Sequence, residues 1–253
     1  MRKIKILNKI ISHKNSPFLI AEAGINHNGS LRRALKMIDI AKNAGVDAIK
    51  FQTYSSDDLI SNINTKYKYK SNGKIYIESM HEMFKRCELS KNSWVKIKKR
   101  CEKKKIIFLS TPSNFNDLDL LLNLNVSAIK VGSDDFNNIP LIQKIIKSKL
   151  PIILSSGMST IKEIQNTLKH AGAKKNYPII LMLCISQYPV DPVDVNISRI
   201  ISLKKKFPKV IIGFSDHTQG SLASSLATAL GARCFEKHFT INKSDHGADH
   251  WFF

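Results

Sequence analysis

The feature that most constrains the fold is a regular alternation of short apolar runs with helical patterns. Eight apolar runs are rich in β-branched or aromatic residues and are too short for helices, so we interpret them as buried strands. Several helical patterns between them begin at Ser, Asn or Thr and end at Gly. The runs are "FLIAEAG" from Phe18, "DAIKFQT" from Asp47, "IIFLSTP" from Ile106, "SAIKVGS" from Ser127, "PIILSSG" from Pro151, "PIILMLC" from Pro178, "VIIGFSD" from Val210 and "ARCFEKHFT" from Ala232.

Strands that alternate with helices predict a parallel sheet that is buried on both faces. Eight such strands within a chain of 253 residues predict a closed TIM (β/α)₈ barrel in the α/β class. An open, doubly wound sheet is the alternative. It is less favoured because "GINHNG", after the first strand, is not the G-x-G-x-x-G fingerprint of a dinucleotide loop.

Two departures from a regular barrel are visible. The connection from Thr53 to Leu89 is long, polar and aromatic, which is typical of a lid or a substrate loop. The sequence ends at Phe253, soon after the eighth run, so we expect a barrel that lacks its last outer helix. We therefore predict an N-terminal hairpin or cap over residues 1–17 and one C-terminally incomplete barrel over residues 18–253.

The net charge of +20 raises the possibility of a nucleic-acid partner. Much of the excess lies in two lysine-rich stretches, at 91–105 and 203–209. In the first, Trp94, Ile97 and Cys101 follow helical spacing, which places the lysines on a solvated face. No nucleic-acid motif accompanies the charge, so we expect neither a nucleic-acid partner nor, since no apolar stretch nears the roughly 20 residues of a membrane helix, a membrane partner.

The cysteines and the N-terminus indicate the compartment. The four cysteines form no C-x-x-C pair, and two of them lie in apolar runs, so they do not form a disulfide framework. Lysines interrupt the apolar part of the N-terminus, and no cleavage site for a signal peptide follows. We therefore predict a cytoplasmic protein.

The most informative pattern is the set of polar residues at the carboxyl ends of the runs, which in a barrel converge on one mouth. Lys50 and Lys130 occupy equivalent places in two of the runs, and a buried lysine is costly without a partner. One interpretation is an ion pair with a carboxylate on a neighbouring strand. The favoured interpretation is an anion site, because ammonium groups and the nearby serine hydroxyls suit a phosphate.

Two histidines complete this set. His217 and His238 lie at the mouth ends of consecutive strands, so their side chains are expected to converge. Beside the carboxylates of Glu22 and Glu236, they form a candidate site for a divalent metal with open positions. The spacing of the two histidines is not specific in itself, and the expected fold supplies their convergence.

At this point the sequence resembles a known family, the N-acetylneuraminate (sialic acid) synthases, which include the legionaminate, pseudaminate and spore-coat polysaccharide synthases. The resemblance runs from Phe18 to His250. It rests on six motifs in this order: "IAEAGINHNGSLRRALKMIDIAKNAGVDAIKFQTY", "FLSTPSNFNDLDLLLNLNVSAIKVGSDDFNNIPLI", "ILSSGMSTIKEI", "CISQYPVDPVDVNI", "IGFSDHTQG" and "EKHFT".

The resemblance implies a transferase for sialic acid biosynthesis that condenses phosphoenolpyruvate with an N-acetylated hexose, such as N-acetylmannosamine. The product is a nine-carbon 2-keto acid, and phosphate is released. The resemblance also implies a divalent metal, Mn²⁺ or Mg²⁺, at His217 and His238, and active-site carboxylates at Glu22 and Glu236. The predicted phosphoenolpyruvate site comprises Lys50, Lys130, Thr111, Ser133, Ser155 or Ser156, Ser186, Tyr188 and Ser215, and Asp249 is predicted to contact the acceptor sugar.

The family also has a small C-terminal antifreeze-like domain that reaches across a homodimer, and this sequence does not contain it. A truncated, inactive barrel that only binds an anionic ligand or a partner is therefore one alternative. Another is a different phosphoenolpyruvate-dependent sugar-acid synthase. Such enzymes take phosphorylated acceptors and need additional arginines at the mouth, where this sequence has none. The sequence does not identify the acceptor sugar.

Overall fold

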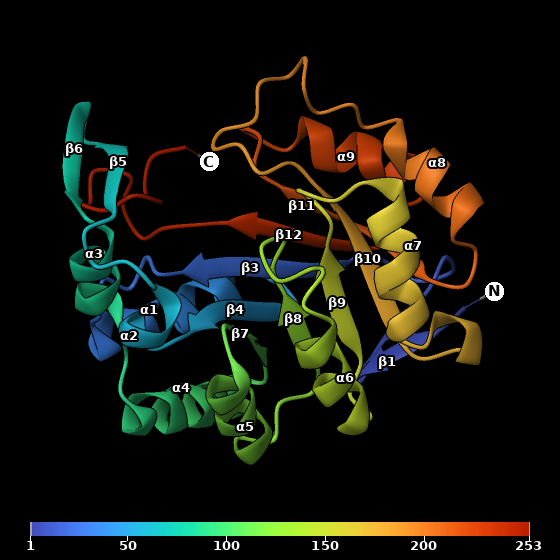
Figure 1. The fold of residues 1–253 in the computed structure, drawn as a ribbon, viewed down its shortest axis with the longest axis horizontal. Helices are drawn as coiled ribbons and strands as arrows, with labels where there is room; N and C mark the ends of the chain where they lie inside the picture. Colours follow the sequence, from blue (N-terminus) through green and yellow to red (C-terminus); the bar gives the residue numbers. More distant parts are fainter. Residues whose placement is uncertain (1, 253) are drawn as a thin grey trace. The chain divides into compact units, whose positions relative to one another are not determined.

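The computed structural model describes residues 2–252, so positions 1 and 253 of the two predicted domains lie outside the described residues. Along the chain, an N-terminal hairpin is followed by alternating strands and helices (Figure 1). The elements are β1 (Ile4–Ile6), β2 (Lys9–Ile11), β3 (Phe18–Gly24), α1 (Leu31–Asn43), β4 (Ala48–Thr53), α2 (Ser56–Leu59), β5 (Lys66–Ser71), β6 (Lys74–Ser79), α3 (Met80–Cys87), α4 (Lys91–Lys104), β7 (Ile107–Pro112), α5 (Phe115–Asn123), β8 (Ile129–Val131), α6 (Ile139–Lys147), β9 (Ile152–Ser155), α7 (Ile161–His170), a 3₁₀ turn (Ala173–Lys175), β10 (Ile179–Cys184), α8 (Arg199–Lys206), β11 (Ile211–Asp216), α9 (Leu222–Ala229) and β12 (Cys234–His238).

The predicted strands are all present. The eight apolar runs form one eight-stranded sheet with the order β7-β4-β3-β12-β11-β10-β9-β8. In this order each strand lies beside its neighbour in the sequence, except that β7 and β8 stand at the two ends of the order. The last strand, β12, lies beside the first, β3. Together with the intervening helices, this is the strand order of a TIM barrel, which confirms the predicted fold class.

The chain divides into two compact units, which are described separately. Unit 1 comprises residues 2–20 and Ser127–Lys237. Its strands β9, β10 and β11 run parallel and in register, and every residue of the three is buried. Near-continuous apolar sequence is expected of parallel strands that are covered on both faces. The β1–β2 hairpin, at the N-terminus of unit 1, is antiparallel.

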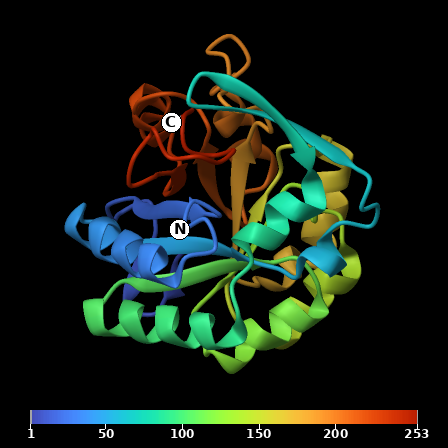
Figure 2. The same ribbon diagram turned by 90° about the vertical axis from the view of Figure 1, so that its left-hand side faces the viewer.

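Unit 2 comprises residues 21–126 and 238–252. Strands β4 and β7 pair in parallel along their full length. Helix α1 packs against α4 in this unit (Figure 2). The rings of Phe51, Trp94 and Phe108 contact one another in the core of unit 2, with centroids 6.0 to 6.4 Å apart. This packing fixes β4, which carries Lys50, against its neighbours.

The insertion between β4 and α4 differs from the expected loop. It contains the short helix α2, the antiparallel hairpin β5–β6 and helix α3. Asn72 and Gly73 form the turn of the hairpin with positive φ values of 49° and 76°, as an Asn-Gly type I′ turn requires. The Asn-Gly pair, with alternating residues on both sides, is the signal that predicts this hairpin.

Other features follow the sequence. Trp94, Ile97 and Cys101 are the buried residues of α4, so the prediction of an outward lysine face is confirmed. The four cysteines are buried and form no disulfide. Within residues 2–252, no helix is both long and apolar enough to cross a membrane.

Candidate active site

Lys50, on β4 of unit 2, lies in a tight pair with a carboxylate. Its side chain is almost completely buried, and its Nζ is 2.8 Å from Oε2 of Glu22. The same ammonium group donates to Oγ1 of Thr111 at 3.2 Å. These three predicted site residues therefore lie together. The ion pair that was the alternative interpretation of Lys50 is present.

Lys130, on β8 of unit 1, has a different environment. Its Nζ donates to Oγ of Ser155 at 2.7 Å and to the carbonyl of Val131 at 3.2 Å. Oε1 of Glu236 is farther away, at 3.7 Å, and accepts a hydrogen bond from Ser215 at 3.0 Å. Lys130 is 2% exposed, so this cation is held in the interior mainly by neutral oxygen atoms.

Two serine hydroxyls converge on the main chain at Gly157, just after β9. The Gly157 amide donates to Oγ of Ser133 at 3.0 Å. A Cβ placed on Gly157 would lie 2.6 Å from Oγ of Ser186, 2.8 Å from Oγ of Ser133 and 3.2 Å from Sγ of Cys184. A methyl group here would displace the two hydroxyls, so the glycine keeps them close to the backbone. We call Lys130, Ser133, Ser155, Gly157 and Ser186 the serine cradle.

His217 follows β11 in unit 1, and its ring is fixed by two contacts. Nδ1 donates to the carbonyl of Ile185 at 2.8 Å, and the ring stacks on Tyr188 with centroids 4.2 Å apart. Burial lowers the pKa of His217, and the hydrogen bond to Ile185 opposes this shift. The imidazole is therefore neutral with its lone pair on Nε2, and Nε2 is 3.4 Å from Oγ of Ser215.

His238 and Asp249 lie together in unit 2. Nδ1 of His238 is 4.0 Å from Oδ2 of Asp249. Both side chains, with Glu22, surround Gly24, where a Cβ would lie between 3.3 and 3.9 Å from an atom of each. Burial raises the pKa of Asp249 to about 6, although its side chain remains 23% exposed. Two carboxyl groups and one imidazole thus gather at the end of β3.

The contacts of these side chains show whether they suit a divalent metal. A ligating histidine usually donates its other ring N–H to a carbonyl or a carboxylate, and His217 does so through Nδ1. His217 therefore fits a metal site through Nε2. Among residues 2–252, no group of three or more His, Cys, Asp or Glu side chains is arranged to hold an ion. His217 belongs to unit 1 and His238 to unit 2, so their convergence stays a prediction.

The predicted site residues thus fall into two groups. The two serine alternatives separate, because Ser155 contacts Lys130 whereas the hydroxyl of Ser156 donates to the carbonyl of Met182 at 3.0 Å. Unit 1 holds Lys130, Ser133, Ser155, Ser156, Ser186, Tyr188, Ser215, His217 and Glu236, and unit 2 holds Glu22, Lys50, Thr111, His238 and Asp249.

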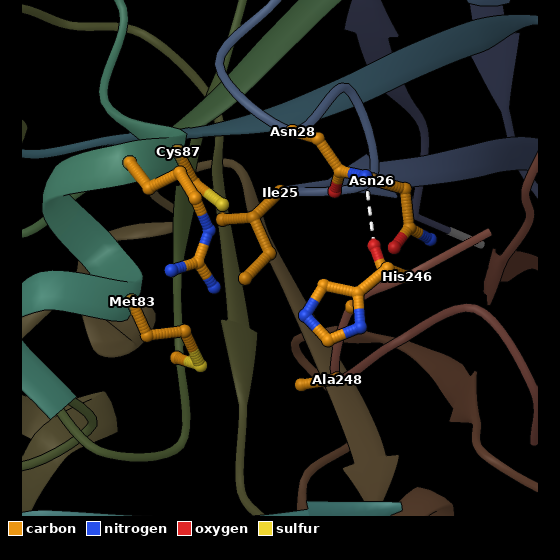
Figure 3. Close-up of a pocket in the computed structure, with 9 residues that line it drawn as sticks. Ile25, Asn26, Asn28, Met83, Cys87, His246 and Ala248 are labelled. Carbon is orange, nitrogen blue, oxygen red and sulfur yellow. Dashed lines mark hydrogen bonds between the residues drawn. The ribbon is translucent and has the colours of Figure 1, made fainter. Parts of the chain in front are cut away.

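A cavity of about 140 Å³ in unit 2 was not predicted (Figure 3). Met83, Arg86 and Cys87 of α3 form one side, and residues 246–248 form another. Asn28 donates to the carbonyl of His246 at 2.8 Å, which ties the loop after β3 to this C-terminal segment. Ala248, which lines the cavity, directly precedes Asp249, so the insertion after β4 packs around the segment that leads into a candidate site residue.

Comparison with known proteins indicates one family. The model of the NeuB family matches residues 37–252. The N,N'-diacetyllegionaminic acid synthase of Legionella pneumophila is 37% identical over 92% of this chain and 66% of its own length. The enzyme of the same name from Campylobacter jejuni is 40% identical over 92% of this chain and 70% of its own length. The chain therefore spans about two-thirds of the length of these relatives.

A solved structure leads to the same family. The N-acetylneuraminic acid (sialic acid) synthetase of Leptospira borgpetersenii, in complex with citrate, superposes with a TM-score of 0.88 and 35% identity. The alignment covers 99% of this chain and 82% of the synthetase. With the family match and the synthase relatives, this identifies the chain as a member of the NeuB family of sugar-acid synthases.

Proposed function

We propose that this chain condenses phosphoenolpyruvate with an N-acetylated hexose, giving a nine-carbon sialic-type 2-keto acid and inorganic phosphate. The serine cradle is the observation that carries the proposal. A buried ammonium group, with several hydroxyls close to a glycine backbone, suits the phosphate or the carboxylate of phosphoenolpyruvate. The NeuB relatives are named as synthases of sugar acids, which agrees with this proposal.

The two lysines have complementary tasks in this proposal. Lys130, which is held mainly by neutral oxygens, neutralises one anionic group of phosphoenolpyruvate. Lys50, with Thr111, supports the other anionic group while it remains paired with Glu22. Because both ammonium groups are buried, their attraction for an anion is stronger than it is at a water-exposed site.

The bonds that change are few. The electron pair of the C2–C3 double bond of phosphoenolpyruvate forms a bond from C3 to the aldehyde carbon of the open-chain sugar. The π bond of the aldehyde opens, and its oxygen takes up a proton. Water adds to C2 and gives a proton to a carboxylate, for which Glu22 and Glu236 are the candidates. The bond between C2 and the phosphate oxygen then breaks, the C2 hydroxyl gives its proton to the departing phosphate, and the 2-keto group forms.

A divalent metal, Mn²⁺ or Mg²⁺, bound by His217 and His238 would polarise the aldehyde oxygen as a Lewis acid. The fixed tautomer of His217, with Nε2 as the acceptor atom, supports this assignment.

Asp249 is proposed to contact the acceptor sugar. The insertion after β4, which lines the cavity beside Ala248, contributes to acceptor recognition. We also propose that the protein acts as a homodimer.

The test is a phosphate-release assay with phosphoenolpyruvate, Mn²⁺ and a panel of acetamido sugars, with mass spectrometry of the products. The expected result is phosphate release that depends on one of the sugars and yields a nine-carbon 2-keto acid. Lys130→Met is expected to abolish it, and Lys98→Met, at a partly exposed ion pair on α4, is the matched control. Phosphate release without a carbon–carbon product, or no sugar-dependent release with any sugar, would contradict the proposal.

A further inference from the structure

Behind the candidate site in unit 1 lies a second polar cluster, built around Asp216 on β11. The side chain of Asp216 is completely buried. Oδ1 accepts from both the amide and the hydroxyl of Thr218, at 2.9 and 2.7 Å. Oδ2 accepts from Oγ of Ser224 at 2.6 Å and lies 3.2 Å from Nζ of Lys237. Both oxygens of this carboxylate are therefore engaged.

Lys237 completes the cluster from the neighbouring strand, β12. Asp216 and Lys237 are register partners in the parallel pair β11–β12. The Lys237 ammonium group also donates to the carbonyl of Thr218 at 2.7 Å. We call Asp216, Thr218, Ser224 and Lys237 the strand clamp. It joins β11, β12, the loop after β11 and the first turn of α9.

The strand clamp and the candidate site lie on opposite faces of the same two strands. Ser215 and Glu236 form the preceding register pair, and their side chains are hydrogen-bonded to each other at 3.0 Å. Because successive side chains of a strand point to opposite faces, the clamp projects away from this pair. In the sequence, the charged pair of the clamp stands between predicted site residues, as Ser215-Asp216-His217 and Glu236-Lys237-His238.

The contacts of the clamp bear directly on His217. Asp216 holds the amide of Thr218 and Lys237 holds its carbonyl, so the peptide groups on both sides of Thr218 are fixed. The carbonyl of His217 accepts from the amide of Val190 at 3.0 Å. The main chain of His217 is thus fixed by these contacts, and the orientation of its ring is set separately by the contacts with Ile185 and Tyr188.

We propose that Asp216 and Lys237 are positioning residues, whose ion pair between a buried carboxylate and a half-buried ammonium group holds the main chain of residues 216–218 so that Nε2 of His217 is aimed at the metal. This inference rests on the proposed function, because it takes His217 to be a metal ligand. Partners that orient a ligating residue without touching the ion typically contribute 10- to 100-fold to metal affinity.

The test is the affinity for Mn²⁺ alone, measured from the electron paramagnetic resonance signal of the free ion with the whole chain and no substrates. Lys237→Met removes both contacts of the ammonium group, and we expect its Kd for Mn²⁺ to rise about tenfold or more. Lys237→Arg keeps a cation within reach of Asp216 and of the Thr218 carbonyl. We expect it to restore the Kd to within about threefold of wild type.

Two further variants separate positioning from general stability. Asp39→Asn removes an ion pair with Arg100 in unit 2 and is the matched control, with an expected Kd equal to that of wild type. Ser224→Ala removes one hydrogen bond of the clamp and is the milder variant if Lys237→Met does not fold. We expect its Kd to rise about two- to threefold, with a thermal unfolding midpoint near that of wild type.

The outcomes are distinguishable. If wild type binds Mn²⁺ and the folded Lys237→Met variant, or Ser224→Ala in its place, binds it equally well, the positioning role is overturned and the proposed function is not. If Asp39→Asn weakens Mn²⁺ binding as much as Lys237→Met, the effect is general and the positioning role is also overturned. If wild type does not bind Mn²⁺ at all, the metal site of the proposed function fails, and the clamp inference fails with it.

Discussion

Lys50 and Lys130 occupy equivalent positions in two similar strands, "AIKFQT" and "AIKVGS", yet they have different environments. Lys50 lies 2.8 Å from a carboxylate oxygen of Glu22, whereas Lys130 is 3.7 Å from Glu236 and donates mainly to a hydroxyl and a carbonyl. A tight buried pair is strongly destabilised when one partner is removed. The comparison shows that two equivalent lysines differ in how they are compensated, by a close carboxylate in unit 2 and mainly by neutral oxygens in unit 1. If Lys130 binds the anionic substrate as proposed, replacing it should chiefly affect binding, whereas replacing Lys50 should also cost stability.

The largest expected effect is on catalysis and concerns Lys130. Lys130→Met removes the cation of the serine cradle, so we expect kcat/KM for phosphoenolpyruvate to fall roughly 1,000-fold, or about 4 kcal/mol. Steady-state phosphate release measures this change. Lys130→Arg keeps the charge with a different shape and is expected to recover only part of the activity. A Lys130→Met variant with more than about a tenth of wild-type kcat/KM would mean that the cradle does not hold the substrate.

The next effect is on stability and concerns Lys50. Lys50→Met leaves Glu22 without its ammonium partner in the interior, so we expect the free energy of unfolding to fall by about 3 kcal/mol. Urea denaturation of Lys50→Met, Glu22→Gln and the double variant measures the coupling between the two. The double variant is expected to be more stable than Lys50→Met. If the changes in the free energy of unfolding of Lys50→Met and Glu22→Gln simply add up in the double variant, the two residues are not a tight pair. If Lys130→Met loses as much stability as Lys50→Met, the two lysines do not differ in their contribution to stability.

A third prediction concerns the acid sensitivity of unit 2. Burial, and secondarily the charge of Arg33, lower the pKa of His27 from 6.5 to about 4, and its Nδ1 accepts from the amide of Gly29 at 3.1 Å. The folded state therefore favours the neutral ring. Its contribution, up to about 3 kcal/mol, is fully present above pH 6.5 and is lost as the pH falls from 6.5 through 4.

Denaturation of wild type and His27→Phe between pH 7 and pH 4 tests this linkage. We expect a smaller fall in the free energy of unfolding for His27→Phe than for wild type. His170→Asn, at an exposed ring on α7, is the control and should follow wild type. Parallel curves for wild type and His27→Phe would show that this imidazole is not buried in the neutral state.

The smallest expected effect concerns the shape of the serine cradle. Gly157→Ala places a methyl group against Ser133 and Ser186, so we expect the KM for phosphoenolpyruvate to rise roughly tenfold, about 1.4 kcal/mol. The KM for the sugar should change little, and the unfolding midpoint should stay close to that of wild type. An equal rise in both KM values would place the defect in the general structure of the site instead of in the cradle.

The sequence predicts the strands well because each is a short apolar run with a clear end. The same periodicity predicts the buried face of α4, where Trp94, Ile97 and Cys101 are spaced as one side of a helix. The β5–β6 hairpin was missed because its composition is polar, although its Asn72-Gly73 turn is a local signal. Local sequence patterns thus predict the secondary structure of a segment wherever that structure depends mainly on the segment's own residues.

The candidate site is less accessible to sequence reasoning, since its contacts join distant segments. Lys50 and Lys130 look equivalent in the sequence, and only the distance to the carboxylate in the folded chain separates them. The sequence does not predict a role for Asp216 or Lys237, because no local pattern distinguishes either residue from the site residues on both sides of it. Their pairing depends on the register of β11 and β12, which no single segment reveals.

The most direct test of the central claim is calorimetric titration of phosphoenolpyruvate into wild type and Lys130→Met, in the presence of Mn²⁺ and without a sugar. We expect saturable binding by wild type and a loss of affinity of at least 100-fold in Lys130→Met. Equal affinity in the two proteins would contradict the claim that the serine cradle of unit 1 holds the anionic substrate.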